Sequence, residues 1–376
     1  MCTLRVSLLA AIAAASFAFG FAAGDGTENN PYQISTPEHL EAVNDDLSAN
    51  YVLTGNIDLS ARTYDRAVIA PDTDYTDRDS EFYHARPIFT GSPFTGSFDG
   101  AGYKIVNLTV DASNAIGDYP CHIGFIGKIE GGLVRNVGIE NTVITFEDVY
   151  YKAEYLGGLA GFNSGTISNC YSAANVSGDA EFLGSLCGSN SGTIEKCNAT
   201  GSVLGGRAAE YVAGLCGRNE GGTISNCYAT GSVTGDFDLG GLCGSNSGTI
   251  INCYATGSVS GSSSLGGLCG QNYYGTISSC FWNTETSGMN TSDGGTGLTI
   301  AQMKAPNTFL DAGWDFAGES ANGIEDIWVM PEDGYPRLAW STSDNSGGIN
   351  PADLNNDGIV DILDFAIFSE NWLLPE

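Results

Sequence analysis

Apolar residues occur along most of this chain in short runs and not at helical spacing. Runs rich in Ile, Val, Thr and Tyr are broken by glycines every few residues, as in DLGGLCGSNSGTIINCYATGSVSG at residues 238–261. Short runs of β-branched and aromatic residues between glycines are typical of strands. No window sustains the period of about 3.6 residues that an amphipathic helix requires. The pattern therefore predicts an all-β chain of many short strands.

One phrase of this pattern recurs every 26–29 residues through the middle of the chain. Each copy has the leucine of a G-x-L element, then a glycine, an asparagine, a Gly-Thr-Ile triplet and a cysteine. The leucines are Leu159, Leu186, Leu215, Leu242 and Leu268, and the asparagines are Asn163, Asn190, Asn219, Asn246 and Asn272. A single copy cannot bury its own apolar face, whereas stacked copies let every strand pair with the coils above and below. The repeat predicts a right-handed parallel β-helix, an all-β solenoid.

Three kinds of residue have expected places in this solenoid. Leu and Ile columns should lie inside, and glycines should stand where the chain turns with positive φ. The repeated asparagine suits a ladder at a bend, in which each side-chain amide hydrogen-bonds to the next. The alternative is that the same asparagines form a row that binds a ligand.

The repeated phrase resembles the GLUG motif, a repeat named for its G-L-x-G core and found in secreted and surface proteins of bacteria. G-G-L-x-G-x-N-x-G-T-I-x-x-C-Y is complete at residues 157–171 and 240–254 and nearly complete in the other three copies. Flanking segments such as PYQISTPEHLEAV also look like those that accompany such repeats, so the resemblance covers residues 30–341. It implies a β-helical architecture and an extracellular setting, and it implies no defined activity.

The cysteines of the repeats form two columns, one beside the leucines and one after the Gly-Thr-Ile triplet. The first column holds Cys187, Cys216, Cys243 and Cys269, and the second holds Cys170, Cys197, Cys227, Cys253 and Cys280. An exported protein can form disulfides, either within a copy as in Cys187–Cys197 or to the next copy as in Cys170–Cys187. We expect at least three disulfides. The alternative is that the thiols stack unpaired as small apolar residues.

The segments 24–155 and 283–341 are expected to complete and cap the solenoid around the repeats at 156–282. Thr36-Pro37-Glu38 can begin a short helix that forms a lid over the first coil. Residues 281–340 are rich in tryptophan, which could form a carbohydrate platform, but we expect a hydrophobic cap that seals the last coil. Its candidate residues are Trp282, Trp314, Trp328 and Trp340.

A long polar insertion at residues 62–87 carries aromatic residues beside carboxylates. Its candidate residues are Tyr64, Asp65, Asp72, Asp74, Tyr75, Asp77, Asp79, Glu81, Tyr83 and His84. Such residues suit sugar binding, and paired carboxylates can cleave glycosides. Nothing in the spacing holds two carboxylates at a working distance, so we expect a solvated loop. His39, His84 and His122 stand apart and the chain has no C-x-x-C pair, so we also expect no metal cluster.

The N-terminal residues and the overall charge indicate an exported protein. Residues 1–23 combine Arg5, an apolar run from Val6 to Phe21 and small residues, as in a secretory signal peptide. No later stretch approaches about 18 consecutive apolar residues, so we expect no membrane span. The chain has 44 acidic and 14 basic residues, a net charge of −30, which argues against nucleic acid as a partner. We expect a secreted, extracellular or cell-surface location.

A linker at 342–350 precedes a tail with the spacing of a calcium loop. Counting from Asp353, oxygen ligands fall at the positions that such a loop uses, and Gly358 stands where the loop turns sharply. The predicted ligands are Asp353, Asn355, Asp357, the carbonyl of Ile359, Asp361 and Asp364. The tail at 351–376 resembles one half of a type I dockerin, the calcium-dependent module by which secreted polysaccharide-degrading enzymes dock on cohesins. The resemblance implies calcium as a cofactor and a cohesin-like or cell-surface partner, although dockerins usually carry two such segments.

Three classes of function fit these observations. The first is a non-catalytic surface, adhesion or scaffold protein whose variable loops, DAEF, GGRAAEY, GDFD and GSSS, present a recognition surface. The second is a polysaccharide lyase or glycosidase on the same fold, although the repeat columns hold no recurring Asp, Lys or Arg group that would abstract a proton. The third is a carbohydrate-binding component of an extracellular complex, with a polysaccharide as ligand. We expect the first class, with no catalytic residues.

Overall fold

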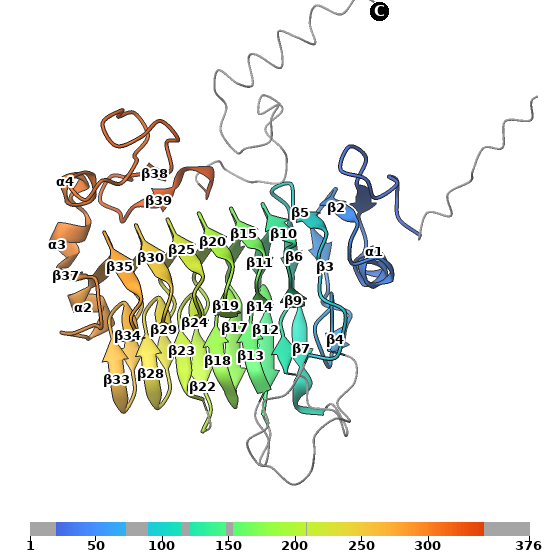
Figure 1. Ribbon diagram of the computed structural model, residues 1–376, viewed down its shortest axis with the longest axis horizontal. Coiled ribbons are helices and arrows are strands. Elements are labelled where there is room, and N and C mark those ends of the chain that lie inside the picture. Colours follow the sequence, from blue (N-terminus) through green and yellow to red (C-terminus); the bar gives the residue numbers. More distant parts are fainter. Residues whose placement is uncertain (1–19, 73–88, 115–120, 148–152, 208, 342–376) are drawn as a thin grey trace, which may run out of the picture.

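The computed structural model describes residues 20–72, 89–114, 121–147, 153–207 and 209–341, which form one elongated solenoid (Figure 1). Five strands make one coil, and equivalent strands of successive coils pair in parallel to give five long sheets. The predicted parallel β-helix is therefore confirmed. Most of the predicted signal peptide and the whole predicted calcium loop lie outside the described residues.

Sheet 1 and sheet 2 contain nine strands each and extend over the length of the solenoid. Sheet 1 consists of β1 (Tyr32–Ile34), β2 (Asn50–Leu53), β5 (Ser97–Asp99), β10 (Leu133–Arg135), β15 (Thr166–Ser168), β20 (Thr193–Glu195), β25 (Thr223–Ser225), β30 (Thr249–Ile251) and β35 (Thr276–Ser278). Sheet 2 consists of β3 (Ile57–Asp58), β6 (Lys104–Val106), β11 (Gly138–Glu140), β16 (Tyr171–Ser172), β21 (Asn198–Ala199), β26 (Tyr228–Ala229), β31 (Tyr254–Ala255), β36 (Phe281–Asn283) and β37 (Thr296–Leu298).

Sheets 3, 4 and 5 complete each coil and contain seven, six and six strands. Sheet 3 consists of β4 (Thr63–Tyr64), β7 (Thr109–Asp111), β12 (Val143–Phe146), β17 (Asn175–Gly178), β22 (Val203–Gly205), β27 (Val233–Thr234) and β32 (Val259–Ser260). Sheet 4 consists of β8 (His122–Ile123), β13 (Ala153–Gly157), β18 (Ala180–Gly184), β23 (Tyr211–Ala213), β28 (Phe237–Gly240) and β33 (Ser263–Gly266). Sheet 5 consists of β9 (Ile126–Ile129), β14 (Ala160–Asn163), β19 (Cys187–Asn190), β24 (Cys216–Asn219), β29 (Cys243–Asn246) and β34 (Cys269–Asn272).

The remaining elements lie at the two ends of the chain and between coils. They are α1 (Pro37–Ala42), η1 (Val43–Asp45), η2 (Ala112–Asn114), α2 (Thr284–Ser287), α3 (Ile300–Met303), α4 (Pro306–Leu310), η3 (Ala339–Ser341) and the antiparallel pair β38 (Trp328–Val329) and β39 (Arg337–Leu338).

The register places the same repeat position of successive coils side by side. In sheet 1, Ile167 pairs with Ile194, which pairs with Ile224, and all three side chains are fully buried. Residues on either side of each isoleucine, such as Thr193 and Glu195, are partly exposed because successive residues of a strand point to opposite faces. The expected internal columns of isoleucine and leucine are thus confirmed.

The repeated asparagine forms the predicted ladder at the bend from sheet 5 to sheet 1. The Nδ2 of Asn163 donates to the Oδ1 of Asn190 at 2.7 Å, and the next rung, Asn190 to Asn219, measures 2.9 Å. The ladder continues through Asn246 to Asn272 at 2.9 and 2.8 Å. The four asparagines from 163 to 246 are fully buried, so this row faces the interior and not a ligand.

Most glycines of the repeat allow close packing, which corrects the expectation that they turn the chain with positive φ. A Cβ at Gly240 would lie 1.8 Å from the carbonyl oxygen of Cys243. Left-handed residues do occur at the bend from sheet 1 to sheet 2, but this bend mostly uses asparagine, which tolerates positive φ better than other side-chain-bearing residues. These asparagines are Asn136, Asn169, Asn226 and Asn252, with φ between 50° and 54°.

All ten cysteines in the described residues are free and buried, so the prediction of at least three disulfides is wrong. The register stacks like on like, with Cys187 beside Cys216, and makes neither the Cys187–Cys197 pair nor the Cys170–Cys187 pair. In-register parallel strands hold equivalent Cβ atoms about 4.8 Å apart, which is more than the ~3.8 Å of a disulfide. The thiols instead donate to nearby carbonyls, as Cys187 does to Ser189 at 3.1 Å. The unpaired alternative is confirmed.

The predicted N-terminal helix is α1, which lies over the first coil (Figure 1). The hydroxyl of Thr36 caps it by accepting from the backbone N–H of His39 at 3.3 Å. Leu40 and Val43 are fully buried and Leu47 packs against them at the edge of the core. The helix thus covers apolar residues that no preceding coil would cover.

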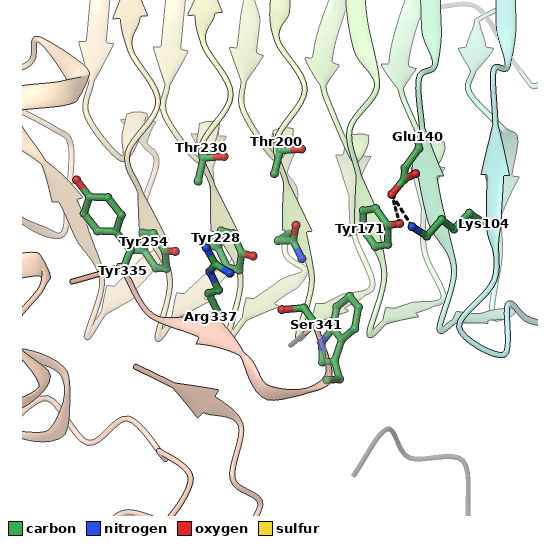
Figure 2. A pocket seen from close by; sticks show the side chains of 13 residues that line it. Lys104, Glu140, Tyr171, Thr200, Tyr228, Thr230, Tyr254, Tyr335, Arg337 and Ser341 are labelled. Carbon is green, nitrogen blue, oxygen red and sulfur yellow. Dashed lines mark hydrogen bonds and ion pairs between the residues drawn. The ribbon is translucent and has the colours of Figure 1, made fainter. Parts of the chain in front are cut away.

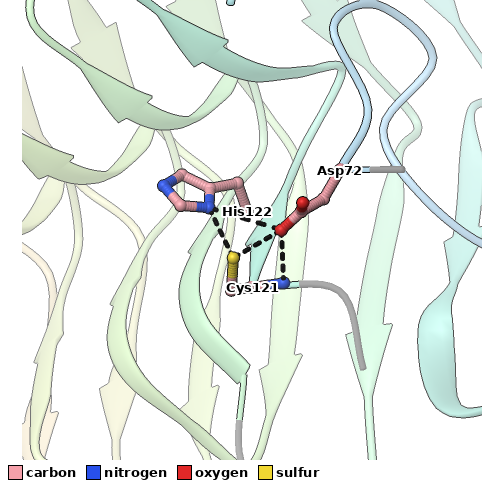
Figure 3. Close-up of side chains that lie close together, drawn as sticks. All are labelled: Asp72, Cys121 and His122. Carbon is pink, nitrogen blue, oxygen red and sulfur yellow. Dashed lines mark hydrogen bonds and ion pairs between the residues drawn. The ribbon is translucent and has the colours of Figure 1, made fainter. Parts of the chain in front are cut away.

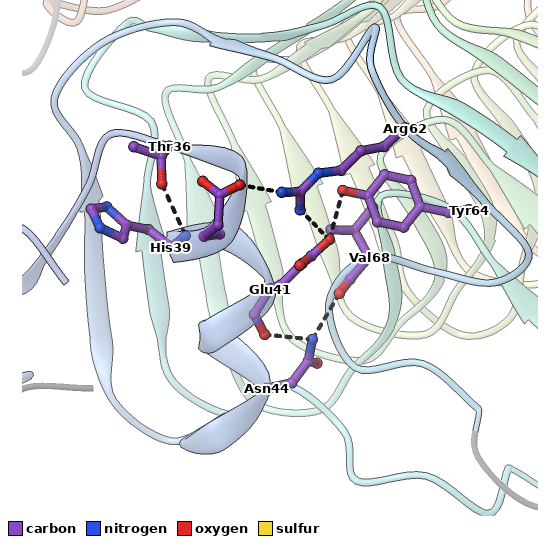
Figure 4. Close-up of polar contacts among 8 residues, drawn as sticks. Thr36, His39, Glu41, Asn44, Arg62, Tyr64 and Val68 are labelled. Atoms are coloured by element: carbon purple, nitrogen blue, oxygen red, sulfur yellow. Dashed lines mark hydrogen bonds and ion pairs between the residues drawn. The ribbon is translucent and has the colours of Figure 1, made fainter. Parts of the chain in front are cut away.

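Polar contacts fasten this helix to the first coil (Figure 4). Arg62 forms ion pairs with both Glu38 and Glu41 of the helix. The Nδ2 of Asn44 donates to the carbonyl of Val68 at 2.8 Å. These contacts fix the start of the polar insertion at residue 62, so this part of it is not a solvated loop.

The C-terminal segment both closes the last coil and turns back along the side of the solenoid (Figure 1). Trp282 packs at the end of the main core. Trp314 and Trp328 are fully buried with aromatic residues of sheet 2 in a second apolar cluster. Trp340 reaches the coil of Lys196, whose carbonyl accepts from its Nε1 at 2.9 Å. The expected cap is therefore only one part of this segment, because the rest covers the outer face of sheet 2.

Candidate functional site

A groove of about 770 Å³ lies between the outer face of sheet 2 and the returning C-terminal segment (Figure 2). Its lining combines aromatic rings, hydroxyls, an amide and three charged groups. The lining residues are Lys104, Glu140, Tyr171, Asn198, Thr200, Tyr228, Thr230, Tyr254, Gly334, Tyr335, Arg337, Trp340 and Ser341. Hence one wall belongs to the repeats and the other to residues 334–341.

The repeat itself builds the aromatic wall. In β26 and β31 the tyrosine of the C-Y pair points outward while the following alanine points into the core, as the two-residue period of a strand requires. Because the strands are in register, the rings of Tyr228 and Tyr254 stack with centroids 5.0 Å apart and planes at 8°. Two coils before Tyr228, the ring of Tyr171 lies against Gly138 of the preceding coil, which leaves room for it, since a Cβ there would lie 2.3 Å from the ring.

Hydrogen bonds hold the second wall in place. The hydroxyl of Tyr254 donates to the carbonyl of Pro336 at 2.7 Å, and the amide of Asn283 donates to the hydroxyl of Tyr335 at 3.1 Å. The ring of Trp340 lies 6.3 Å from that of Tyr171. Arg337, from β39, remains exposed at the mouth of the groove. The walls are thus fixed by the protein itself and leave a cationic group free to contact a ligand.

A charged cluster of Lys104 and Glu140 lies at one end of the groove (Figure 2). Glu140 accepts from the ammonium of Lys104 at 3.0 Å and from the hydroxyl of Tyr171 at 2.5 Å. Burial alone would raise the pKa of Glu140, but these two bonds outweigh it and lower the pKa. Burial and the neighbouring carboxylate raise the pKa of Tyr171. Glu140 is therefore an ionised acceptor at neutral pH and a poor proton donor.

This combination can bind a sugar but lacks the usual means to cleave one. A sugar ring has an apolar C–H face that packs on aromatic rings and hydroxyls that bind carboxylates, amides and guanidinium groups. Glycoside cleavage normally requires two carboxyl groups about 5–9.5 Å apart, one of them protonated. Glu140 is the one carboxylate among the described residues that line the groove. The described lining of the groove thus offers groups that can bind a sugar, and it contains no pair of carboxyl groups.

The residues singled out from the sequence have different fates. In the described part of the insertion, the hydroxyl of Tyr64 donates to the carboxylate of Glu41 at 3.2 Å, and Asp65 forms an ion pair with Arg66 at 2.8 Å. Asp65 is thus paired with a cation and not with a second carboxylate. Trp340 is the one predicted tryptophan that lines the groove. The other insertion candidates, from Asp74 to His84, and all six predicted calcium ligands lie outside the described residues.

Several groove residues were not predicted from the sequence. The tyrosines of the groove do occupy a fixed place in the repeat, directly after the second cysteine, and this signal was available. Nothing in the sequence placed Arg337 beside them, because that contact depends on how the C-terminal segment returns along sheet 2.

The expectation that the histidines are isolated is wrong for His122. Asp72, Cys121 and His122 come together at the start of sheet 4, with the three ligating atoms within 4.8 Å of one another (Figure 3). Cys121 and His122 are adjacent in the sequence, but Asp72 precedes Cys121 by 49 residues. This long separation hid the cluster from motif spacing.

These features define the protein as a parallel β-helix of short repeats with a lateral groove. The family model described as the GLUG motif matches residues 152–177, 208–234 and 235–260. The copies around Leu186 and Leu268 have the same register in the sheets although they lie outside these ranges.

Two curated relatives match part of this chain. A 164-residue stretch, 42% of this chain, is 30% identical to halomucin of Haloquadratum walsbyi and spans 2% of that protein. A 152-residue stretch, 40% of the chain, is 34% identical to a provisionally named Gly-rich membrane protein of Evansella cellulosilytica and spans 15% of it. The chain thus matches only a small part of each relative. Among the described residues, no helix is long and apolar enough to cross a membrane.

A solved structure supports the fold. The crystal structure of a provisionally named immunoglobulin A1 protease from Bacteroides ovatus has a TM-score of 0.58 to this chain and 19% sequence identity. The similarity covers 85% of this chain and 95% of that one. At this level of identity the similarity concerns the fold alone.

Proposed function

We propose that this chain is a non-catalytic protein of the cell surface or extracellular space that binds a glycan in the groove along sheet 2. The observation that carries the proposal is the groove itself, in which the ring of Trp340 lies beside that of Tyr171 and the exposed guanidinium of Arg337 belongs to the same lining. A pre-formed groove that combines aromatic rings with fixed polar groups is the usual form of a small-molecule or sugar site.

The location at the surface is supported by the comparisons and by composition. One relative, 34% identical over 152 residues, is named as a membrane protein. A strong excess of acidic residues keeps an extended protein soluble and free of nonspecific contacts with nucleic acid. An apolar N-terminal run of signal-peptide type fits export.

The C-terminal tail supplies an attachment function in this proposal. The ligand spacing from Asp353 to Asp364 fits one calcium ion, and the following apolar residues fit a short helix. The tail would hold the solenoid on a cohesin-like or cell-surface partner when calcium is bound. The attachment module would then follow the groove closely in the chain, because Ser341 lines the groove and the linker begins at residue 342.

Affinity electrophoresis and calorimetry with a panel of neutral and acidic polysaccharides test the glycan proposal. We expect binding of at least one polysaccharide and a loss of about tenfold in Arg337→Ala, because a charge-assisted hydrogen bond contributes about 1.5–3 kcal/mol. Trp340→Ala should lose a similar factor through lost ring contact. The matched control is Tyr274→Ala, which removes a fully exposed ring outside the groove.

The same samples distinguish the alternative functions. Release of reducing ends or of unsaturated products by the unmodified protein would establish the glycosidase or lyase alternative. Unchanged binding in both groove variants would show that the glycan binds elsewhere, and no binding to any polysaccharide would overturn the groove proposal.

A further inference from the structure

Three buried side chains with metal-ligating atoms meet where sheet 4 begins (Figure 3). The Sγ of Cys121 lies 2.8 Å from the Nδ1 of His122 and 2.5 Å from the Oδ2 of Asp72, and the last two atoms are 3.8 Å apart. The exposed fractions are 1% for Cys121, 5% for His122 and 1% for Asp72. No other three Cys, His, Asp or Glu side chains in the described part of the chain come as close.

The surrounding fold holds each of the three groups in a fixed orientation. The Oδ1 of Asp72 accepts from the backbone N–H of Thr90 at 2.9 Å and from its hydroxyl at 3.0 Å, so Oδ2 is the oxygen that faces the thiol. The His122 ring is packed against Phe89, with centroids 4.9 Å apart, and against Tyr155 at 4.7 Å. A site with so little freedom is already organised for a ligand.

We propose that Asp72 Oδ2, Cys121 Sγ and His122 Nδ1 bind one divalent transition-metal ion of the zinc class, with water as the fourth ligand. One sulfur, one imidazole nitrogen and one carboxylate oxygen form a set that zinc accepts in tetrahedral geometry. Calcium does not fit this set, because it takes six to eight oxygen ligands. The site is therefore chemically distinct from the calcium loop predicted in the tail.

The geometry and the charges are compatible with such an ion. Zinc bonds of about 2.0–2.3 Å place tetrahedral ligand atoms roughly 3.4–3.6 Å apart. The pair from His122 to Asp72 is already at 3.8 Å, and the two contacts of the sulfur must open by roughly 1 Å. On binding, the S–H bond of Cys121 breaks and its proton passes to solvent. The thiolate and the Asp72 carboxylate then neutralise the 2+ charge, with His122 neutral.

A nucleophilic role for Cys121 is less well supported than metal binding. Burial and the Asp72 carboxylate raise the pKa of Cys121, and burial lowers the pKa of His122 despite its contact with Asp72. A reactive cysteine needs the opposite, a thiolate beside an imidazolium in an accessible cleft. A bound cation would instead lower the pKa of the Cys121 thiol, because it stabilises the thiolate directly.

The site also has a structural consequence for the open end of the solenoid. The segment before Asp72 covers the edge of sheet 5, where Ile69 forms a parallel bridge to Ile126. Exposed strand edges of solenoids need such covering. An ion shared by Asp72 and the Cys121–His122 pair would link this cover to the first strand of sheet 4.

Cobalt(II) titration of the full chain, purified free of metal under reducing conditions, tests the proposal. We expect one cobalt ion to bind with a near-ultraviolet thiolate-to-cobalt charge-transfer band, to release one proton, and to be displaced by zinc but not by excess calcium. Cys121→Ser should abolish the band, and His122→Gln should weaken binding at least tenfold. The matched control is Cys187→Ser, which alters an equally buried thiol in the repeat column.

The absence of a charge-transfer band in the folded, unmodified protein would overturn the proposal. A band that persists in Cys121→Ser would also overturn it, since the ion would then bind at the repeat cysteines. X-ray absorption of the zinc-loaded unmodified protein gives an answer that does not depend on whether a variant folds. One sulfur in the first shell is expected, and a shell of oxygen and nitrogen alone contradicts the assignment.

Discussion

The side-chain amide of Asn190 donates a hydrogen bond to the side-chain oxygen of Asn219, 2.9 Å away, and Asn219 donates in the same way to Asn246. Each of these amides is fully buried. The amide of Asn219 also donates to the carbonyl of Gly222 at 3.0 Å. The ladder thus satisfies a row of polar groups inside an otherwise apolar bend and keeps successive coils in register.

Removing a central rung should destabilise the solenoid strongly. Asn219→Ala removes four hydrogen bonds of a buried side chain at once, those with Asn190 and Asn246 and those to the carbonyls of Gly222 and Thr249. Each such bond contributes about 0.5–1.5 kcal/mol. The free energy of unfolding, measured by chemical denaturation, should fall by at least ~2 kcal/mol. The control Asn272→Ala, at the half-buried end of the ladder, should lose clearly less, and equal losses would contradict the ladder's role.

Adding one methyl group at a packed glycine should also lower the free energy of unfolding strongly. A Cβ at Gly240 would lie 1.8 Å from the carbonyl oxygen of Cys243, so Gly240→Ala must displace backbone in two strands. Overpacking of this kind costs about 1–3 kcal/mol or more. At Gly55 a Cβ would meet nothing within 4 Å, and Gly55→Ala should leave the melting temperature nearly unchanged. Similar melting temperatures for the two variants would show that the repeat glycines are not needed for close packing.

Much of the fold could be predicted because one repeat equals one coil. The recurrence of Leu159, Asn163 and their equivalents fixed the register, the internal columns and the asparagine ladder, all of which depend on residues at the same place in successive coils. The roles of glycine and cysteine were harder to predict. A left-handed bend can be occupied by an asparagine such as Asn169 as well as by a glycine. Two columns of cysteines are compatible with disulfides in the sequence, and only the structure shows that the thiols are unpaired.

The sites could be predicted only in part, because they depend on contacts outside the repeat. The groove needs the return of Arg337 and Trp340 along sheet 2, and no periodicity describes that segment. The cluster at Cys121 needs Asp72, which is 49 residues away in an irregular insertion. The stacking of the repeats can therefore be predicted from their sequence, whereas the contacts of the C-terminal segment and of the insertion can be found only in the three-dimensional structure.

The buried thiols, nine in the repeat columns and Cys121, should be reduced and protected in the folded protein. We expect the ten cysteines from Cys121 to Cys280 to react slowly with a thiol reagent at neutral pH and fully in denaturant. Intact mass should be the same before and after reduction, because stacked thiols are not cross-linked. A mass that increases by two hydrogens per bond on reduction would show disulfides and contradict the free columns.

Stability should fall at alkaline pH. Burial raises the pKa of Tyr254 well above 10, and burial together with contact to Cys187 raises the pKa of Cys216 well above 9. A raised native pKa means that the unfolded chain loses these protons first, so the free energy of unfolding is fully present below about pH 9 and falls above it. Denaturation midpoints measured from about pH 7 to pH 11 should therefore decrease steadily over the alkaline half of the range.

The variant Tyr254→Phe separates the contribution of this tyrosine. It should be less stable at neutral pH, since the bond from Tyr254 to the carbonyl of Pro336 is lost, and should show a shallower alkaline decrease. The exposed Tyr274→Phe is the control and should follow the unmodified protein. An alkaline profile that is flat in the unmodified protein would contradict the burial of these groups.

The predicted calcium loop should take up one ion with modest affinity. Asp353, Asp357, Asp361 and Asp364 repel one another within twelve residues, and calcium removes this repulsion. A single loop lacks the paired loop that usually makes such sites rigid, so the dissociation constant should lie nearer to about 10⁻⁴–10⁻³ M than to the values of intracellular buffers. Calorimetry on the full chain should show binding that Asp353→Ala and Asp357→Ala abolish and that Asp344→Ala, in the linker, preserves. If the unmodified chain takes up no calcium at millimolar concentration, or if all three variants bind alike, the ligand assignment from Asp353 to Asp364 is wrong.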